Sequence, residues 1–165
     1  MQKGGGVVSK VNRGKQFEEV IKKSFEKIPD VSIDRLHDQT TGYLGSKNIC
    51  DFIVYKKPYE YYIECKSIHG NTFPLSNITD NQFSGLLNKS KIKGVIAGLI
   101  IWFVDKDVTI FVEINDLKVA KDLGDKSIRF DEAYIRLQGK KKRVFFDYDM
   151  DHFFHTIEKM NRREV

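Results

Sequence analysis

The sequence predicts an α/β fold in which helices flank a central mixed β-sheet. Three observations indicate this. Helical periodicity and strand-like alternation follow one another in mixed order along 165 residues, a length typical of one domain. The apolar run at 94–104 is too short for a membrane helix, which needs about 20 residues, and is typical of a strand buried on both faces. The composition, 41% hydrophobic and 31% charged, excludes collagen-like and wholly disordered classes.

Each element follows from local signals in the sequence. Asn12 is a candidate N-cap for a helix whose apolar residues recur at three- and four-residue spacing until Pro29. Thr79 or Asn77 is a candidate cap for a second helix that reaches about residue 90. The other predicted elements are, in chain order, a strand at 31–36, a loop at 37–48, a hairpin of strands 49–55 and 59–67, strands at 94–104 and 108–114, a short helix at 115–121, a strand at 143–147 and a helix from 149 to about 160.

The terminal segments, the net charge and the number of cysteines limit the class of protein. Residues 1–11 are Gly-rich and lack periodicity, so we expect a flexible N-terminal arm before a single folded domain at 12–165. The 28 Lys and Arg residues exceed the 23 Asp and Glu residues by 5, a mild bias toward polyanions such as nucleic acid. Two cysteines are too few for a disulfide scaffold, and the N-terminus has no apolar stretch like that of a signal peptide. We therefore expect a cytoplasmic protein without a membrane partner.

The predicted hairpin brings two carboxylates and an amine together. A symmetric turn over 56–59 pairs residues whose numbers sum to 115, which places Asp51 opposite Glu64. Period-two alternation adds Lys66 to the same face. It also predicts that Cys50 and Cys65 face each other on the opposite side, close enough for a bridge but more simply as buried reduced thiols.

This trio has a catalytic and a structural interpretation. Opposed carboxylates repel unless a cation lies between them, and oxygen ligands suit Mg²⁺ or Mn²⁺. The pattern therefore indicates metal-assisted phosphodiester hydrolysis, with Lys66 orienting the nucleophile, stabilising charge on the phosphate or acting as the base. The structural interpretation is an exposed cross-strand ion cluster without catalytic function.

The same residues carry a resemblance. Asp51 followed across a hairpin by Glu64-x-Lys66 resembles the PD-(D/E)XK nuclease superfamily, although the proline of that name is absent. More specifically, the chain is similar to RecU-type Holliday junction resolvases over residues 12–82, where the matching elements stand in the same order. These elements are Asn12-Arg13-Gly14 opening a helix that contains Glu18, then Asp51, Glu64-x-Lys66, and Phe73-Pro74-Leu75-Ser76-Asn77 followed by Gln82.

The resemblance implies a restriction-endonuclease-like nuclease core and a Mg²⁺-dependent endonuclease, with Mn²⁺ able to substitute. Its substrate would be four-way branched DNA, cut by paired symmetric incisions by a homodimer in a bacterium or a phage-infected bacterial cell. It implies Asp51 and Glu64 as metal ligands, Lys66 as the catalytic lysine, and Glu18 as a further catalytic residue that completes the site through a metal or water. It also implies Gln82 as a contact to the site or the DNA. Two alternatives stay open: another nuclease of the superfamily, of restriction or repair type, and a non-catalytic junction-binding module.

The chain departs from the RecU pattern before the aspartate. Such sequences commonly have Thr-Thr where this chain has Ile49-Cys50, so the hydroxyls of Thr40, Thr41 or Ser46 are candidate substitutes. The segment before Asp51 is also short where that family inserts a long stalk. We expect the loop at 37–48, with Tyr43 and Leu44, to be a reduced version of that stalk.

Basic residues supply candidate DNA contacts. The densest run is Lys140, Lys141, Lys142 and Arg143, which suits sequence-independent phosphate binding. Arg13, at a helix start, is a second candidate because a guanidinium binds phosphate bidentately. For any one lysine, a solvated surface position is the simpler interpretation.

Overall fold

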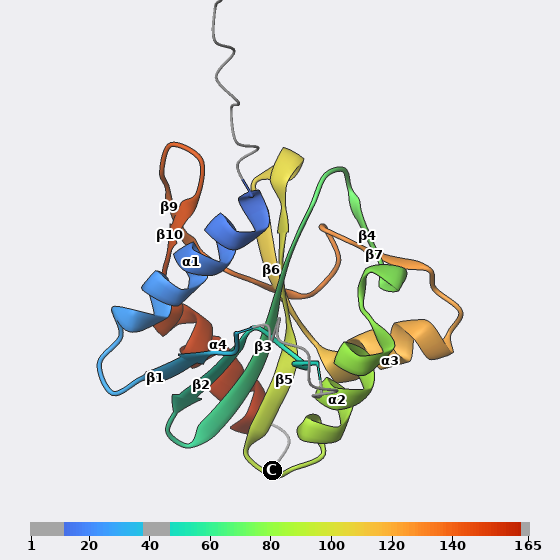
Figure 1. Ribbon diagram of the computed structural model, residues 1–165, viewed down its shortest axis with the longest axis horizontal. Coiled ribbons are helices and arrows are strands. Elements are labelled where there is room, and N and C mark those ends of the chain that lie inside the picture. Colours follow the sequence, from blue (N-terminus) through green and yellow to red (C-terminus); the bar gives the residue numbers. More distant parts are fainter. Residues whose placement is uncertain (1–11, 38–46, 163–165) are drawn as a thin grey trace, which may run out of the picture.

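A six-stranded mixed sheet forms the centre of the computed structural model, which describes residues 12–37 and 47–162 (Figure 1). Neighbouring strands are β1 (Ser32–Arg35), β2 (Phe52–Lys56), β3 (Tyr59–Ile68), β5 (Val95–Phe103), β6 (Val108–Glu113) and β8 (Ile135–Arg136), in that order. The β3–β5 pair is parallel and the other pairs are antiparallel. The predicted α/β class with a central mixed sheet is confirmed.

Helices cover both faces of this sheet. Side chains of α1 (Arg13–Glu26) and α4 (Met150–Arg162) share one core cluster with the sheet. Side chains of α2 (Asp80–Ser90) and α3 (Ile114–Asp122) share the cluster on the other face. The smaller elements are β4 (Thr72–Pro74) paired with β7 (Ser127–Arg129), β9 (Gly139–Lys141) paired with β10 (Phe146–Tyr148), and the 3-10 turns η1 (Leu75–Asn77) and η2 (Val104–Lys106).

Strand β5 is buried on both faces, as its apolar sequence predicts. Ile100 and Trp102 pack in the α1–α4 cluster, whereas Leu99 and Ile101 pack in the α2–α3 cluster. Burying an aliphatic side chain of this size stabilises the fold by about 1.5–3 kcal/mol. β5 therefore gives the neighbouring β3 a rigid support along its whole length.

Two local predictions are confirmed in detail. The hairpin register follows the sum of 115, with Phe52 opposite Ile63 and Val54 opposite Tyr61. Asn12 caps α1, where its side chain accepts a hydrogen bond from the Lys15 backbone N–H at 3.3 Å. Both features depend on residues close in sequence, so the sequence pattern specifies them.

The predicted strand at 143–147 is wrong at its start. β10 begins at Phe146, because residues 142–145 form the turn of the β9–β10 hairpin, where the Lys142 N–H donates to the Phe145 carbonyl at 2.8 Å. The short strands β4, β7, β8 and β9 were not predicted, since two or three residues show no periodicity.

The prediction that Cys50 and Cys65 face each other is also wrong. Cys50 packs in the α2–α3 cluster and Cys65 in the α1–α4 cluster, and both are free, buried thiols. β2 begins only at Phe52, so the strand alternation does not extend back to Cys50.

Some predictions fall outside the described residues. They are the N-terminal arm at 1–11 and the candidate residues Thr40, Thr41, Tyr43, Leu44 and Ser46 of the loop. Within 12–37 and 47–162, no helix combines the length and apolar character that a membrane span requires.

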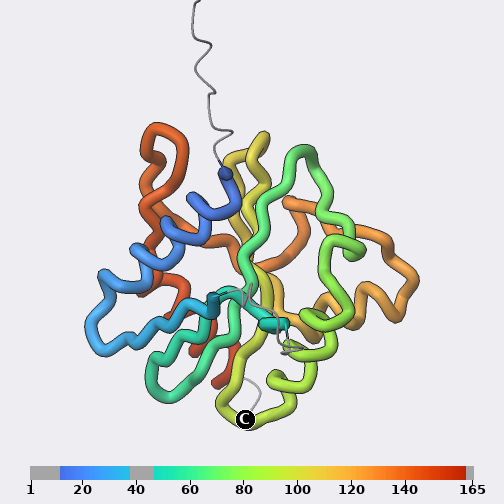
Figure 2. The backbone as a smooth tube through the Cα atoms, viewed as in Figure 1, coloured from blue at the N-terminus to red at the C-terminus, as the bar shows by residue number. Residues whose placement is uncertain are grey.

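The N- and C-terminal parts of the described chain meet on one side of the molecule. Figure 2 shows the β9–β10 hairpin beside α1. Lys27, at the end of α1, forms an ion pair with Asp147 of β10. The densest basic segment of the sequence, 140–143, is therefore on a hairpin that packs beside α1 and not beside α2.

Candidate active site

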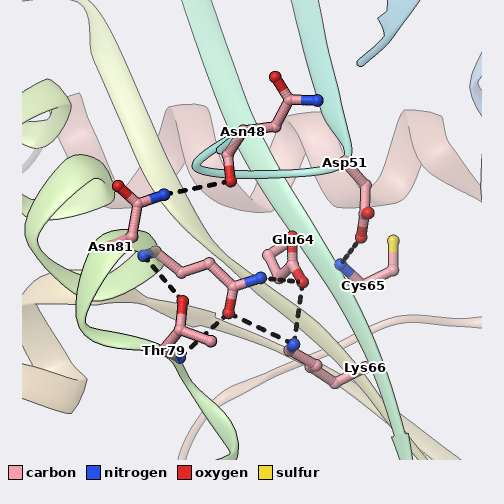
Figure 3. A network of polar contacts seen from close by, with 8 residues as sticks. Asn48, Asp51, Glu64, Cys65, Lys66, Thr79 and Asn81 are labelled. Carbon is pink, nitrogen blue, oxygen red and sulfur yellow. Dashed lines mark hydrogen bonds and ion pairs between the residues drawn. The ribbon is translucent and has the colours of Figure 1, made fainter. Parts of the chain in front are cut away.

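Asp51 is fixed between two strands. Its N–H donates to the Ile63 carbonyl at 3.1 Å, and its carbonyl accepts from the Leu36 N–H at 2.8 Å. The carboxylate points to β3, where Oδ2 accepts the Cys65 backbone N–H at 2.7 Å (Figure 3). Backbone and side chain are thus both held by β3, although β2 begins only at the next residue.

Glu64 and Lys66 stand two residues apart on β3 and face α2. Glu64 is 5% exposed, and its Oε1 lies 3.0 Å from the Lys66 ammonium nitrogen. The parallel pairing of β3 with the buried strand β5 holds both positions, with Glu64 opposite Leu99 and Lys66 opposite Ile101. The convergence of an acidic and a basic group predicted from the alternation is present.

Gln82 of α2 joins this pair. Its Nε2 donates to Glu64 Oε1 at 2.7 Å, and its Oε1 accepts from the Lys66 ammonium at 3.4 Å. The same oxygen accepts the Thr79 backbone N–H at 3.2 Å. The structure thus places Gln82 in contact with both charged residues on β3.

Burial raises the pKa values of both carboxyls. Desolvation, followed by the charge of Glu64, raises the pKa of Asp51 to about 7. Desolvation also raises the pKa of Glu64, while the Lys66 ammonium opposes that rise. The hydrogen bond between the two carboxyls raises the pKa of Asp51 and lowers that of Glu64.

This donor set fits a magnesium-like ion. Mg²⁺ is usually bound by one or two carboxylates and keeps several waters. Asp51 and Glu64 offer two carboxyls whose mutual repulsion a divalent cation would relieve. In the described part of the chain, no group of three or more His, Cys, Asp or Glu residues is arranged to hold a metal. Among the described residues, Asp51 and Glu64 are the side chains that would hold such an ion.

Glu18 lies at the margin of the site. Its Oε2 is 2.5 Å from the Arg35 guanidinium on β1, and its negative charge raises the pKa of Glu64. Arg35 was not predicted, because a contact between a helix and a strand distant in sequence leaves no local signal. By contrast, the spacing Thr79-x-x-Gln82 is the capping-box pattern and could have identified the contact between these two residues.

The basic candidate DNA contacts are exposed at the surface. Arg13 is exposed at the first turn of α1. The run from Lys140 to Arg143 is exposed on the β9–β10 hairpin, where the Lys141 ammonium lies 2.6 Å from Asp107 Oδ1. Because this hairpin packs beside α1 and Gln82 lies on α2, the structure does not bring the basic run into contact with Gln82.

The match to a family model agrees with the resemblance stated from the sequence. Residues 15–150 match the model of the family described as Recombination protein U (RecU), and that range contains all five network and margin residues, Glu18, Asp51, Glu64, Lys66 and Gln82. Among solved structures, Hjc, a Holliday junction resolvase from the archaeal hyperthermophile Archaeoglobus fulgidus, is 15% identical, with a TM-score of 0.46 over 62% of this chain and 74% of that chain. No curated protein sequence matches.

Proposed function

Because the chain belongs to the Recombination protein U family, we propose that it is an endonuclease that resolves four-way (Holliday) DNA junctions by paired symmetric incisions. The observation that carries the proposal is the network of Asp51, Glu64, Lys66 and Gln82. It combines two partly desolvated carboxyls with an ammonium held in a fixed position. An exposed ion cluster, the structural alternative, does not account for a Glu64 side chain that is almost fully buried.

The proposed cofactor is Mg²⁺, with Mn²⁺ as a substitute, held by Asp51 and Glu64. When bound, the ion supplies Lewis-acid polarisation of a phosphoryl oxygen and lowers the pKa of a bound water. The Cys65 backbone N–H fixes the orientation of the Asp51 carboxylate for this purpose. Gln82 does the same for Glu64.

Lys66 is the proposed catalytic lysine. Glu64 and Gln82 hold its ammonium from two sides, so the charge stays directed at the position where a phosphate would meet the carboxylates. A preorganised cation beside a phosphate stabilises the charge that develops in the transition state. Glu18 completes the margin of the site, with its carboxylate held by Arg35.

In our proposal, the DNA backbone is bound by residues outside this network. Arg13 and the exposed Lys140, Lys141, Lys142 and Arg143 are the proposed phosphate contacts, which give affinity without sequence preference. A four-way junction with two symmetric cut sites favours a two-fold enzyme, so we propose a homodimer. By this proposal the protein works on DNA in the cytoplasm of a bacterium or of a phage-infected bacterial cell. Sedimentation equilibrium in solution should give twice the chain mass.

The test is cleavage of an immobile four-way junction, with each strand end-labelled in turn, in Mg²⁺, Mn²⁺ or EDTA. We expect symmetric nicks in two opposed strands with either metal and none in EDTA. Glu64→Gln should bind the junction with unchanged affinity and cut it more slowly by about 10²–10⁴-fold. Glu60→Gln is the matched control, because the same change on the same strand lies outside the network.

The alternatives predict different gels. A restriction- or repair-type nuclease would cut linear duplex of the same sequence as fast as the junction. A junction-binding module would retain junction affinity and cut nothing in any metal, so Glu64→Gln would change no measurement. Either result would overturn the proposed function.

A further inference from the structure

Helix α2 contacts both halves of the proposed site through its first two turns. Gln82 reaches Glu64 and Lys66 on β3. On the other side, Asn81 donates from Nδ2 to the carbonyls of Lys47 and Asn48, at 3.0 and 3.5 Å, just before Asp51. Figure 3 shows the contact with Asn48. One rigid element therefore spans the two chain segments that supply the carboxyls.

Thr79 fixes the orientation of Gln82. The Thr79 hydroxyl accepts the Gln82 backbone N–H at 3.2 Å, and Gln82 Oε1 accepts the Thr79 backbone N–H at 3.2 Å, which together make a capping box. With Oε1 held by Thr79 and Lys66, the amide nitrogen must point to Glu64. A carboxylate at this position would face Glu64 with like charge, and an apolar side chain would leave both contacts unmade.

Gly85 sets the depth at which α2 packs. A Cβ at this position would lie 2.2 Å from Cγ2 and 2.7 Å from Cβ of Ile49. Neither atom is the far end of a flexible chain, so a larger residue would push α2 and the segment at 47–49 apart. Gly85 stands one helical turn after Asn81 and Gln82, so both contacts depend on this close approach.

We infer that Thr79, Asn81 and Gly85 are positioning residues that set the distance between Asp51 and the Glu64–Lys66 pair. Asp51 is held on its other side by the backbone of β3 and of Leu36, just after β1, so α2 is the element that closes the frame around it. None of the three residues touches the reacting atoms. The inference rests on the proposed function, since it gives the network a reaction to position.

The experiment compares four variants of the full chain with the wild type: Thr79→Val, Thr79→Ser, Asn81→Ala and Gly85→Ala. Ser84→Ala is the matched control, because Ser84 is exposed on the same helix and its hydroxyl contacts only the helix backbone. Two quantities are measured. They are the ¹³C shifts of the Asp51 and Glu64 carboxyls in metal-free protein, and the single-turnover rate on the four-way junction at saturating protein.

We expect Thr79→Val, Asn81→Ala and Gly85→Ala to move the carboxyl resonances and to lower the single-turnover rate by about 10–100-fold, the usual effect of losing a group that orients a catalytic or metal-binding residue. Junction affinity in EDTA should stay unchanged. Thr79→Ser, which keeps the hydroxyl cap, should restore both readouts, and Ser84→Ala should change neither.

Two results would overturn the inference. One is unmoved carboxyl resonances in Thr79→Val and Asn81→Ala, a readout that needs neither DNA nor metal and therefore stands even where the wild type cuts nothing. The other is an unchanged cleavage rate in variants whose only change is a lower melting temperature. The wild type could fail to cut junctions while the carboxyl resonances of the variants move as expected. That result would overturn the proposed function, but it would support the role of α2 in positioning the carboxyls.

Discussion

The network around Glu64 and the β9–β10 hairpin both concentrate charge, but they differ in burial and support. Glu64 is 5% exposed and stands on a strand that is paired on both sides. Lys140, Lys142 and Arg143 are exposed on a two-stranded hairpin outside the main sheet. The first region is built to hold groups in one geometry, and the second to offer charge at a surface.

The pKa values of the two regions move in opposite directions for this reason. In the network, burial raises the pKa of Asp51 to about 7. On the hairpin, the hydrogen bond from Lys27 lowers the pKa of Asp147, which is partly exposed. Desolvation therefore dominates in one region and pairing in the other, so substitutions should affect chemistry in the first and affinity in the second.

The largest expected effect is on cleavage by Lys66→Met, which keeps the length of the side chain and removes its charge. We expect the single-turnover rate on a four-way junction to fall by about 10²–10⁴-fold, because the variant has no preorganised cation beside the phosphate. Lys56→Met on β2 is the control and should cut at the wild-type rate. Equal rates for the two variants would remove the distinction between the regions.

A charge-removing triple variant of the hairpin should weaken binding and leave the chemical step intact. In Lys140→Ala/Lys142→Ala/Arg143→Ala, Lys141 is kept because it holds Asp107 and the hairpin turn. The slope of log affinity against log salt should fall by about 0.9 for each phosphate that the variant no longer neutralises, so by up to about 3. Fluorescence anisotropy across a salt series measures this slope.

The control for this variant is Lys118→Ala/Lys126→Ala/Lys159→Ala, which removes the same charge from exposed positions elsewhere. An identical decrease of the slope in the control would assign the effect to net charge. A lower single-turnover rate at saturating protein would show that the hairpin reaches the cut site.

Metal-free protein should lose stability as pH rises from about 5 to 8. The folded-state pKa of Asp51 is raised from 3.8 to about 7, so the folded protein binds this proton more tightly than the unfolded chain, and the stabilisation disappears as pH passes through that range. We expect a decrease on the order of 2 kcal/mol in the free energy of unfolding in EDTA.

Urea unfolding of the wild type and of Asp51→Asn at both pH values tests this, and the variant should show a flatter profile. Asp147→Asn is the control, since its lowered pKa affects stability only in more acidic solution. Mg²⁺ should restore more stability at pH 8 than at pH 5. A wild-type profile as flat as that of Asp51→Asn would contradict the raised pKa of Asp51.

The smallest expected effect is that of the cysteines. Cys65→Ala should cut within about threefold of the wild-type rate, because Asp51 is held by the backbone N–H of residue 65 and not by its thiol. Burial raises the pKa of Cys50 to about 12 and raises that of Cys65, so both thiols should react with a disulfide reagent far more slowly in folded than in urea-unfolded protein. Fast labelling of the folded chain would contradict their burial.

The sequence specified the parts of the site that depend on short-range pairing. The hairpin register, in which paired residue numbers sum to 115, places Asp51 near Glu64. A tight turn and an alternating pattern allow one register that buries Phe52 and Ile63. Gln82 was predicted only from the family resemblance. Its capping-box spacing with Thr79 is also present in the sequence and could have predicted its contact with Thr79.

The parts that depend on packing between distant segments were not predictable in this way. The Glu18–Arg35 pair needs α1 to lie beside β1, and the Asn81 contact needs α2 to lie beside residues 47–48. Cys50 was misplaced because the strand begins at Phe52, three residues later than the predicted start at residue 49. In each case, tertiary contacts decided what local patterning left open.

The parallel pairing of β3 with β5 has a consequence for the electrostatic field inside the candidate site. Parallel neighbours need a crossover, and here α2 belongs to that return path. Its amino-terminal turn ends beside Glu64, so the positive pole of the helix macrodipole meets the anionic end of the network. The connectivity that closes the core therefore also supplies a fixed partial positive charge, without any further ionisable side chain.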